Sequence, residues 1–480
     1  MSERFAFDWR HYRAIAIAFL VIKLVLFVTA RPFMDETYYW LWGQHLALSY
    51  FDHPPLIGWT QAVASLLGWN TVGLRAMVLL TLIGDIALLY GFARHLSGEA
   101  WRQPFWMAVM LLTVTPVFFA LTTVALPDHL LLFTSLLAVY AFVRFGAAYE
   151  AGVPRWRFLY IAALAIGLAT LSKYTGAILL AAAFVALIWH RPLRSALRTL
   201  HPYLAALLVV AMQTPVVIWN LQNDFASFGW IAGGRRPLAA FDLTGLWGYL
   251  AGFLLVLSPF LIWPMIRFAT GRGGDSLLSR LIFWLSTLAF LVASLFTNIL
   301  IHWNLVAYAA SLPFLHRYLR SRVLVIGHAL FGLLIAGVLA FNTTVAPVMA
   351  FVSFTDQTSA WSYGWEEVAR EVSAIAEAEG TDFVAGTEYS LASPLAFALA
   401  DPDVVSLAAR VEAFDFWFDP QRRAGQTAII VGDRWRPIAD DIRRQFGSIE
   451  EVKTIVVERL GKPVDVYTIS IGRAYAPPGQ

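Results

Sequence analysis

Long apolar stretches separated by short polar segments run from the N-terminus to about residue 346. A membrane-spanning helix needs roughly 20 mainly apolar residues, so this pattern predicts about eleven spans. We expect them near residues 12–30, 72–93, 104–123, 128–146, 157–171, 174–189, 202–219, 245–266, 281–300, 304–316 and 323–346. The first apolar stretch is long for a signal peptide, so we expect it to remain as a span.

After Pro347 the pattern changes to short apolar runs and amphipathic stretches, which are typical of a mixed α/β domain. We therefore expect a polytopic α-helical membrane domain over residues 1–346 and a separate α/β domain over residues 347–480. The expected elements of the second domain are helices at 365–379 and 437–446 and strands at 383–385, 428–431, 452–457 and 464–471.

Two connections, near residues 31–71 and 220–244, are too long to be simple turns. In the first, the aromatic residues between Tyr38 and Leu48 indicate a short amphipathic helix at the membrane interface, where aromatic rings are stabilised. We expect this helix to cover the membrane domain without crossing the bilayer.

The composition agrees with a membrane protein, since 59% of the 480 residues are hydrophobic and 14% are charged, against about 25% charged in soluble domains. Residues 1–346 hold 23 of the 35 Lys and Arg but 12 of the 32 Asp and Glu, a net charge of +11, whereas residues 347–480 carry −8. This division does not suggest a nucleic-acid partner. The absence of Cys excludes disulfides, thiolate nucleophiles and thiolate metal sites.

Basic residues alternate between the two sides of the predicted spans. If the N-terminus is cytoplasmic, the connections on its side carry 17 Arg residues, and the opposite connections carry four basic residues, Arg31, Lys173, Arg235 and Arg236. The positive-inside rule predicts this orientation, and an odd number of spans then places residues 347–480 outside.

Acidic residues of the membrane domain gather on one side. Six of the twelve fall on or near the predicted outer face: Asp35, Glu36, Asp52, Asp128, Asp224 and Asp242. Carboxylates at membrane depth are costly and usually functional, so this distribution favours one external site over a conduction path. Asp85 falls in the middle of the second span, where we expect it to have a polar partner inside the bundle.

Asp35 and Glu36 are adjacent at a predicted span exit. Two acids in one low-dielectric cavity raise the pKa of one of them toward that of a general base. Capping of the following helix, whose N-terminus favours anions, is an equally good interpretation of the composition.

The order of the motifs resembles a known family. Asp-Glu-x-Tyr-Tyr-x-Leu-Trp at residues 35–42, followed by Tyr-Phe-Asp-His-Pro-Pro at 50–55, resembles the first external loop of the GT-C glycosyltransferases that use polyprenyl-phosphate sugars. That group includes the protein O-mannosyltransferases and the lipid A aminoarabinose transferases, and the chain looks most like its bacterial branch. The resemblance continues at residues 126–128, 171–175, 219–228 and 302–303.

This resemblance implies a GT-C fold with external juxtamembrane helices, and Asp35 as the catalytic carboxylate with Glu36 beside it. It also implies a bacterial inner-membrane protein whose active site and C-terminal domain are periplasmic. The donor would be a polyprenyl (undecaprenyl) phosphate sugar, and the acceptor lipid A, a polysaccharide or a protein. We expect inversion at the anomeric carbon, because a single displacement puts the acceptor opposite the phosphate.

A departing phosphate has to be stabilised by cations near the outer face. Lys173, Arg235 and Arg236 are the candidate phosphate ligands, and contact of their side chains with lipid headgroups is the alternative interpretation. Tyr39 and Asp224 are further substrate-binding candidates, although Asp224 is equally compatible with a role in loop structure.

His53 and His302 are candidates for assisting the phosphate or for binding a divalent metal ion together with Asp52 or Asp128. Structural hydrogen bonding is the alternative for both histidines. Asp128 follows Pro127 at a helix start, so an N-cap is its alternative role.

Two other functions are compatible with an acidic, aromatic outer cavity. A transporter or flippase of a lipid-linked saccharide predicts ionisable groups through the whole depth of the bilayer. A non-catalytic subunit of envelope assembly predicts that Asp35→Asn leaves function intact.

Overall fold

The computed structural model describes residues 6–234, 241–352 and 357–477. Its contacts divide the chain into two compact units. The helical unit consists of Met1–Leu24, Leu48–Leu56 and Met77–Ala336, and the C-terminal unit consists of Val25–Ala47, Ile57–Ala76 and Gly337–Gln480. Because two segments near the N-terminus group with the C-terminal region, a domain boundary at residue 346 stays a prediction.

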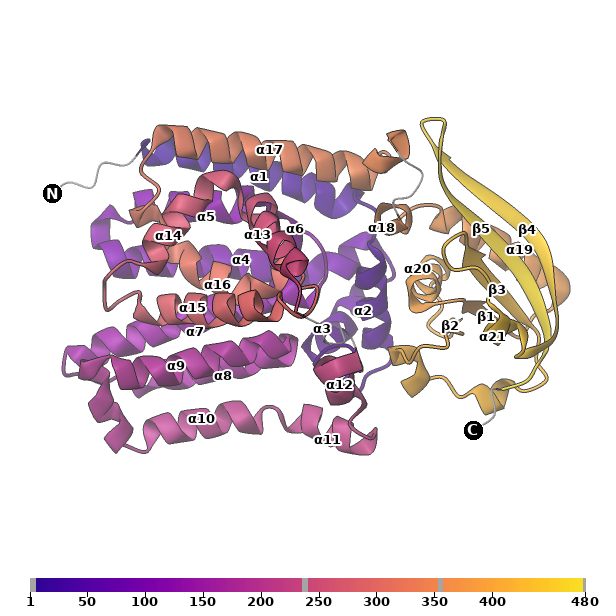
Figure 1. Cartoon of the computed structure of the whole chain (residues 1–480), viewed down its shortest axis with the longest axis horizontal. Helices are drawn as coiled ribbons and strands as arrows, with labels where there is room; N and C mark the ends of the chain where they lie inside the picture. Colours follow the sequence, from indigo (N-terminus) through magenta and orange to yellow (C-terminus); the bar gives the residue numbers. More distant parts are fainter. Residues whose placement is uncertain (1–5, 235–240, 353–356, 478–480) are drawn as a thin grey trace. The chain divides into compact units, whose positions relative to one another are not determined.

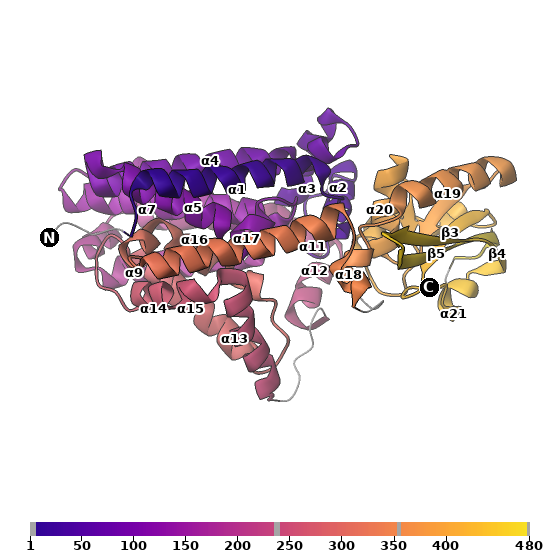
Figure 2. The same cartoon turned by 90° about the horizontal axis from the view of Figure 1, so that it is seen from above.

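The helical unit is a bundle in which α7, α8, α9 and α10 lie next to one another (Figure 1). Figure 2 shows α13 at a steep angle to the other helices. Ser258, the residue that follows α13, has a positive φ of 82°. The helices that lie mainly in this unit are α1 (Trp9–Thr29), α4 (Thr71–Ser97), α5 (Arg102–Val114), α6 (Pro116–Leu121), α7 (Pro127–Glu150), α8 (Trp156–Ser172), α9 (Ala177–Trp189), α10 (His201–Ala211), α11 (Thr214–Gln222), α12 (Ala226–Gly229), α13 (Leu243–Leu257), α14 (Ile262–Ala269), α15 (Leu277–Ala293), α16 (Leu305–Ser311) and α17 (Arg322–Thr344). Residues 25–29 of α1, 71–76 of α4 and 337–344 of α17 belong to the C-terminal unit.

Several of these helices are suited to crossing a membrane. Among the described residues, five are long and apolar enough, and the number rises to seven if each of two bent pairs counts as one span. The expected 104–123 span is divided into α5 and α6, because Thr115 is extended and Pro116 begins a new helix. The mainly helical character is confirmed, and the count of eleven spans stays a prediction.

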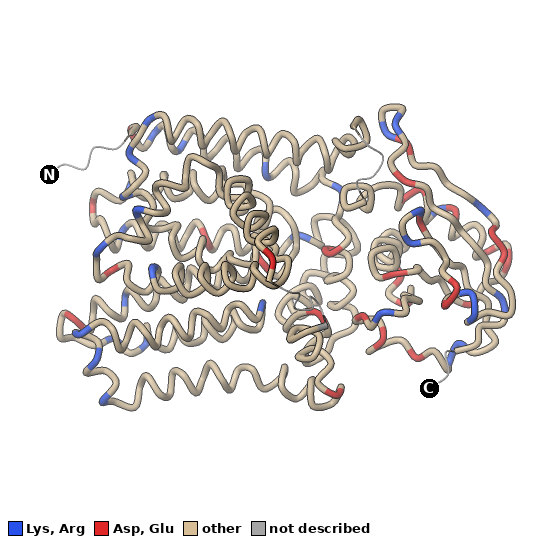
Figure 3. Tube along the Cα trace, viewed as in Figure 1, with Lys and Arg blue, Asp and Glu red and all other residues tan. Residues whose placement is uncertain are grey.

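Charged residues are unevenly distributed over the bundle. Figure 3 shows few charges along the middle of the helices and a concentration of Lys and Arg at the end of the bundle where the N-terminus lies. This distribution agrees with connections that share one side of a membrane. The orientation itself stays a prediction.

The C-terminal unit contains a five-stranded sheet in the order β2-β1-β3-β5-β4. β1 (Phe383–Gly386) pairs in parallel with β2 (Val405–Ser406) and with β3 (Ala428–Asp433). β5 (Lys462–Tyr475) runs antiparallel to β3 and to β4 (Phe446–Arg459). Figure 2 shows α19 (Trp365–Glu379) and α20 (Tyr389–Leu399) on one face of this sheet. The short helices of the unit are α2 (Met34–Gln44), α3 (Leu56–Ala64), α18 (Gln357–Ala360) and α21 (Asp440–Arg443).

Most elements expected after Pro347 are confirmed. α19 has the predicted bounds, since Gly380 ends it with φ 62°, and four strands lie where they were expected. The helix predicted over 437–446 is wrong: α21 spans Asp440–Arg443, and Phe446 begins β4 because its ring packs into the core beside Ile430 and Tyr475. α20 was not predicted, and its interior Pro394 weakens the helical signal in the sequence.

The aromatic helix of the first long connection is α2, but its surroundings differ from the prediction. Nine of its eleven residues are buried, so it is not an amphipathic surface helix. The Tyr38 ring lies 4.7 Å from that of Tyr389, and its hydroxyl accepts a hydrogen bond of 3.0 Å from the Ala413 N–H. His45 stacks on Trp417 at 4.7 Å. α2 thus packs by its aromatic residues within the C-terminal unit, and its placement at a membrane interface stays a prediction.

Candidate functional site

Glu36 is held by a closed set of hydrogen bonds at the start of α2. Its Oε1 accepts from Arg75 Nε at 2.8 Å, and its Oε2 accepts from Arg75 Nη2 at 2.7 Å and from the Phe33 N–H at 2.9 Å. Both charged side chains are completely buried. A bidentate guanidinium–carboxylate pair of this kind fixes orientation as well as charge. The capping interpretation is therefore correct for Glu36.

Arg75 also binds the end of α1. Its Nη1 donates to the carbonyls of Leu26, Phe27 and Ala30 at 3.3, 3.2 and 3.0 Å, and its Nη2 donates to the Arg31 carbonyl at 3.2 Å. The last carbonyls of a helix lack partners within the helix and favour a cation. One guanidinium thus joins the C-terminus of α1 to the N-terminus of α2.

Asp35 lies in the first turn of α2, one residue before this ion pair. It is half-buried, whereas Glu36 is fully buried. Sequence reasoning overlooked Arg75, although a cation inside an otherwise apolar helix was a signal that could have revealed it. The adjacent acids thus have different surroundings, and Asp35 is the one with partial access to solvent.

Asp128 and Lys173 form an ion pair in the helical unit. Lys173 Nζ lies 2.8 and 3.0 Å from the two carboxylate oxygens of Asp128, and both side chains are more than nine-tenths buried. The neighbouring Ser172 hydroxyl donates to the Pro127 carbonyl at 2.6 Å. The N-cap of α7 is Leu126, so the N-cap interpretation of Asp128 is wrong. Because Lys173 turns inward to Asp128, headgroup contact is also wrong for it.

The two candidate histidines lie in the same unit. His302, on a short helix over Ile301–Asn304, interacts electrostatically with Asp128. His53 is buried, Asp52 is half-buried, and the adjacent Phe51 ring stacks on Trp230 at 5.3 Å. Within the described ranges, no three His, Asp or Glu side chains form a group that could hold a metal ion.

Asp224 lies on a turn that a neighbouring residue stabilises. Asp224 and Phe225 both have positive φ, at 50° and 56°. The buried Asn220 holds this turn, since its Oδ1 accepts from the Phe228 N–H at 3.0 Å and its Nδ2 donates to the Val216 carbonyl at 2.9 Å. The motif around Trp219 thus owes its local geometry to Asn220, and Asp224 is exposed.

Three candidates remain: Tyr39, Arg235 and Arg236. Tyr39 is buried in α2 with its ring 4.9 Å from that of Trp42, so it belongs to the packing of the helix. Arg235 and Arg236 lie outside the described residues.

The C-terminal unit contains a cavity of about 480 Å³, within the range of roughly 300–1,000 Å³ that is usual for small-molecule sites. Arg31, Trp69, Asn70, Trp365, Phe397 and Arg459 are among the residues that line it. Arg31 also lies over the Tyr363 ring at 4.3 Å. Glu366 and Glu367 also line it, and Glu367 accepts from Arg459 at 3.0 Å, so aromatic, amide and charged groups of both signs meet there and suit a polar saccharide.

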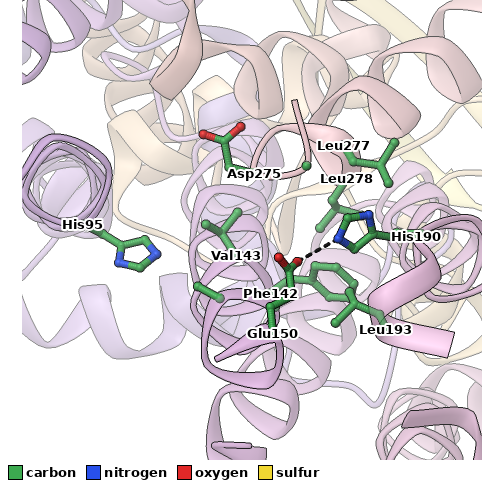
Figure 4. Close-up of a pocket in the computed structure, with 13 residues that line it drawn as sticks. His95, Phe142, Val143, Glu150, His190, Leu193, Asp275, Leu277 and Leu278 are labelled. Carbon is green, nitrogen blue, oxygen red and sulfur yellow. Dashed lines mark hydrogen bonds and ion pairs between the residues drawn. The ribbon is translucent and has the colours of Figure 1, made fainter. Parts of the chain in front are cut away.

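A smaller cavity of about 110 Å³ lies in the helical unit (Figure 4). His190 and Glu150 form an ion pair of 2.7 Å at its edge, and His95 and Asp275 also line it. Glu150 ends α7, whereas Asp128 lies in its first turn. A rise of 1.5 Å per residue puts the two about 33 Å apart, so this cavity is separate from the Asp128–Lys173 pair.

The chain is similar to several known proteins. Residues 52–219 match the family model described as dolichyl-phosphate-mannose-protein mannosyltransferase. The lipid A galacturonosyltransferase RgtD of Rhizobium johnstonii (strain DSM 114642 / LMG 32736 / 3841) is 27% identical over 415 residues, which cover 81% of this chain and 82% of that protein.

Solved structures of ArnT from Cupriavidus metallidurans have a similar fold. The apo structure matches with a TM-score of 0.61 and 15% identity over 97% of this chain and 98% of that one. The structure with bound undecaprenyl phosphate matches with a TM-score of 0.62 and 16% identity over 95% and 97%. This likeness confirms the fold class predicted from the sequence motifs.

Proposed function

Because this chain is a membrane glycosyltransferase of the GT-C superfamily, we propose that it transfers one sugar from a polyprenyl phosphate to an acceptor of the lipid A class. Undecaprenyl phosphate is the proposed carrier, as in the ligand-bound ArnT structure. The acceptor class is proposed from the similarity to RgtD over most of both chains. The bacterial inner membrane, with the site on the periplasmic side, is the proposed location.

The observation that carries the proposal is the half-buried Asp35 beside the fully closed Glu36–Arg75 pair. Asp35 is the proposed base: it accepts the proton of an acceptor hydroxyl while the hydroxyl oxygen attacks the anomeric carbon. The bond from that carbon to the phosphate oxygen breaks, and polyprenyl phosphate leaves with the electron pair. Attack opposite the phosphate inverts the anomeric configuration. Glu36 and Arg75 take part by holding the turn that carries Asp35.

A sugar on polyprenyl phosphate is already activated, so stabilising the departing phosphate is the second requirement. We propose Lys173 for this role, with Asp128 orienting its ammonium group. Arg235 and Arg236 remain proposed phosphate ligands. His53, Asp52, His302, Asp224 and Tyr39 also remain proposed substrate-binding residues. If the acceptor nucleophile is itself a phosphate, no base is required, and Asp35 positions the donor instead.

The cavity of the C-terminal unit is the proposed place for the acceptor headgroup. Trp69 and Trp365 offer aromatic surface to sugar rings, and Asn70, Glu366 and Glu367 offer hydrogen-bond partners to sugar hydroxyls. Its position within the same unit as Asp35 supports this role.

The test is the release of free undecaprenyl phosphate from a panel of undecaprenyl-phosphate sugars, with purified lipid A as the acceptor. Membranes with the wild-type protein should consume one donor and add its sugar to lipid A. Asp35→Asn should lower the rate at least about a hundredfold, the usual contribution of a positioned base. Asp242→Asn is the matched control. It removes a carboxylate predicted on the outer face, while the Asn side chain still caps α13. Equal rates for wild type and Asp35→Asn would contradict the role of Asp35.

A further inference from the structure

The helical unit buries a second cation, Lys23 on α1, which is 1% exposed. Its ammonium group donates to the Phe119 carbonyl at 2.6 Å and to the hydroxyls of Thr122 and Thr123 at 2.9 and 2.7 Å. It also lies 4.6 Å from the centroid of the Phe119 ring. An ammonium group has three donors, and Lys23 donates all three to the end of α6 and to the residues just after it.

This connection leads directly to Asp128. α6 ends at Leu121 and α7 begins at Pro127, so Asp128 is the second residue of α7. Only Val124, Ala125 and Leu126 separate Thr123 from that helix. A link of three residues is too short to move independently of its ends, because each residue spans at most about 3.6 Å. The position of Lys23 thus limits where α7 begins.

α4 holds the same helix start from another direction. The Thr81 hydroxyl and His129 Nδ1 are 2.9 Å apart, and His129 is completely buried next to Asp128 in the sequence. Asp85 lies four residues after Thr81 in α4, on the same face of the helix. Asp85 thus lies about one turn further along α4 than the contact with His129, next to Gly84, which packs against Phe133 of α7.

Asp85 is completely buried and interacts electrostatically with Lys23. Within residues 6–234, 241–352 and 357–477, neither of its carboxylate oxygens has a hydrogen-bond partner. The polar partner expected for Asp85 is therefore not found among the described residues. A carboxylate in such a place is strongly disfavoured, and groups of this kind inside a membrane domain are usually functional.

We propose that Lys23 is a positioning residue for the Asp128–Lys173 pair, because its three hydrogen bonds fix the connection that presents Asp128. The hydroxyls of Thr122 and Thr123 donate to the carbonyls of Phe118 and Phe119, so each of them accepts a hydrogen bond from Lys23. Asp85 interacts electrostatically with Lys23, so the two residues are varied together. The inference rests on the proposed phosphate-binding role of Lys173.

The test compares Lys23→Met, Asp85→Asn and the double variant in the purified full-length protein. The measurements are the midpoint of thermal unfolding, the Kd for undecaprenyl phosphate, and hydrogen exchange of residues 119–129. Lys23→Met should unfold at lower temperature, bind undecaprenyl phosphate about tenfold more weakly and exchange faster over residues 119–129. Asp85→Asn should show the same changes to a smaller extent.

The double variant separates positioning from simple charge balance. It leaves no unpaired buried charge, so its unfolding temperature should return toward that of the wild type. Its Kd should remain raised, because the three hydrogen bonds to the α6–α7 connection are still missing. Tyr160→Phe is the control: it removes a hydrogen bond of 2.9 Å to His201 in the same unit and should leave the Kd unchanged.

Three results would overturn the proposal: an unchanged Kd in Lys23→Met, recovery of both stability and Kd in the double variant, or the same Kd change in Tyr160→Phe. Binding and hydrogen exchange do not depend on turnover. If the wild type binds undecaprenyl phosphate but transfers no sugar, the proposed function fails, and the role of Lys23 is still decided by the Kd values. A wild type that binds no undecaprenyl phosphate would contradict both.

Discussion

Each unit holds a buried cation that pairs with a carboxylate, Arg75 in one and Lys173 in the other, and the two pairs differ in how many donors they use. In the C-terminal unit, all donor nitrogens of Arg75 are engaged, two of them with Glu36 and the rest with backbone carbonyls. In the helical unit, both contacts of Lys173 go to the single carboxylate of Asp128. A saturated guanidinium acts as a structural clamp, whereas an ammonium held on one side keeps a donor for a ligand. The hydrogen bonds that remain available to each cation therefore distinguish the structural clamp at Arg75 from the proposed phosphate ligand Lys173.

The largest expected effect is the loss of stability on removal of the Arg75 guanidinium. Arg75→Met should lower the free energy of unfolding by about 3–5 kcal/mol, because Glu36 would remain buried without a counter-charge. Arg75→Lys should rescue little of this loss, since an ammonium cannot bind bidentately or reach four carbonyls. Chemical denaturation of the purified protein measures the change. If Arg75→Met is as stable as the wild type, Arg75 is not a structural clamp and does not differ from Lys173 in this respect.

The buried carboxyl of Asp465, in the sheet of the C-terminal unit, should make the stability of that unit depend on pH. Burial, and then the charge of Asp433, raise the pKa of Asp465 to about 7. A carboxyl whose pKa is raised on folding stabilises the protein fully below its unfolded pKa, and this contribution is lost as the pH rises through about 7. Between pH 5 and pH 8.5 the loss should be about 3 kcal/mol.

Thermal unfolding at several pH values measures this loss in the wild type and in Asp465→Asn, whose curve should be flatter. Asp403→Asn, at an exposed position, is the control and should follow the wild type. If the stability of the wild type changes with pH by the same amount as that of Asp465→Asn, Asp465 is ionised over the whole range and the prediction is wrong.

Lys173→Met tests the cation that is proposed to bind the phosphate. Removal of this ammonium should weaken undecaprenyl phosphate binding at least about tenfold, with a smaller loss of stability than Arg75→Met, because the N-terminus of α7 still favours the Asp128 carboxylate. Native mass spectrometry of the protein in detergent measures the binding. A variant that loses stability and keeps its affinity would make Lys173 a clamp like Arg75.

The smallest effect is expected for Tyr38→Phe. This change removes the hydrogen bond from the Ala413 N–H and keeps the ring beside Tyr389. The expected loss of stability is about 1 kcal/mol, the usual value for one hydrogen bond. A thermal shift assay together with the donor-release assay checks this. A large loss of activity at nearly normal stability would mean that this contact adjusts α2 and thus Asp35.

Local sequence was a reliable guide to elements and motifs. The bounds of Trp365–Glu379 followed from amphipathic periodicity and the terminal Gly380, and the acidic motif pointed to Asp35. The failed helix at 437–446 shows the opposite case, since the local pattern was overruled by the packing of Phe446 in the sheet core. Burial against distant residues outweighs the small differences in helix propensity.

The sequence alone determined that this is a helical membrane protein with an α/β region near its C-terminus, because apolar length and periodicity are local properties. It also pointed to the family through motifs in order along the chain. The tertiary structure decided which charges are paired: Glu36 with Arg75, 39 residues apart, and Asp128 with Lys173, 45 residues apart. Such pairings depend on how helices pack, and that packing brings together residues whose spacing along the chain carries no signal.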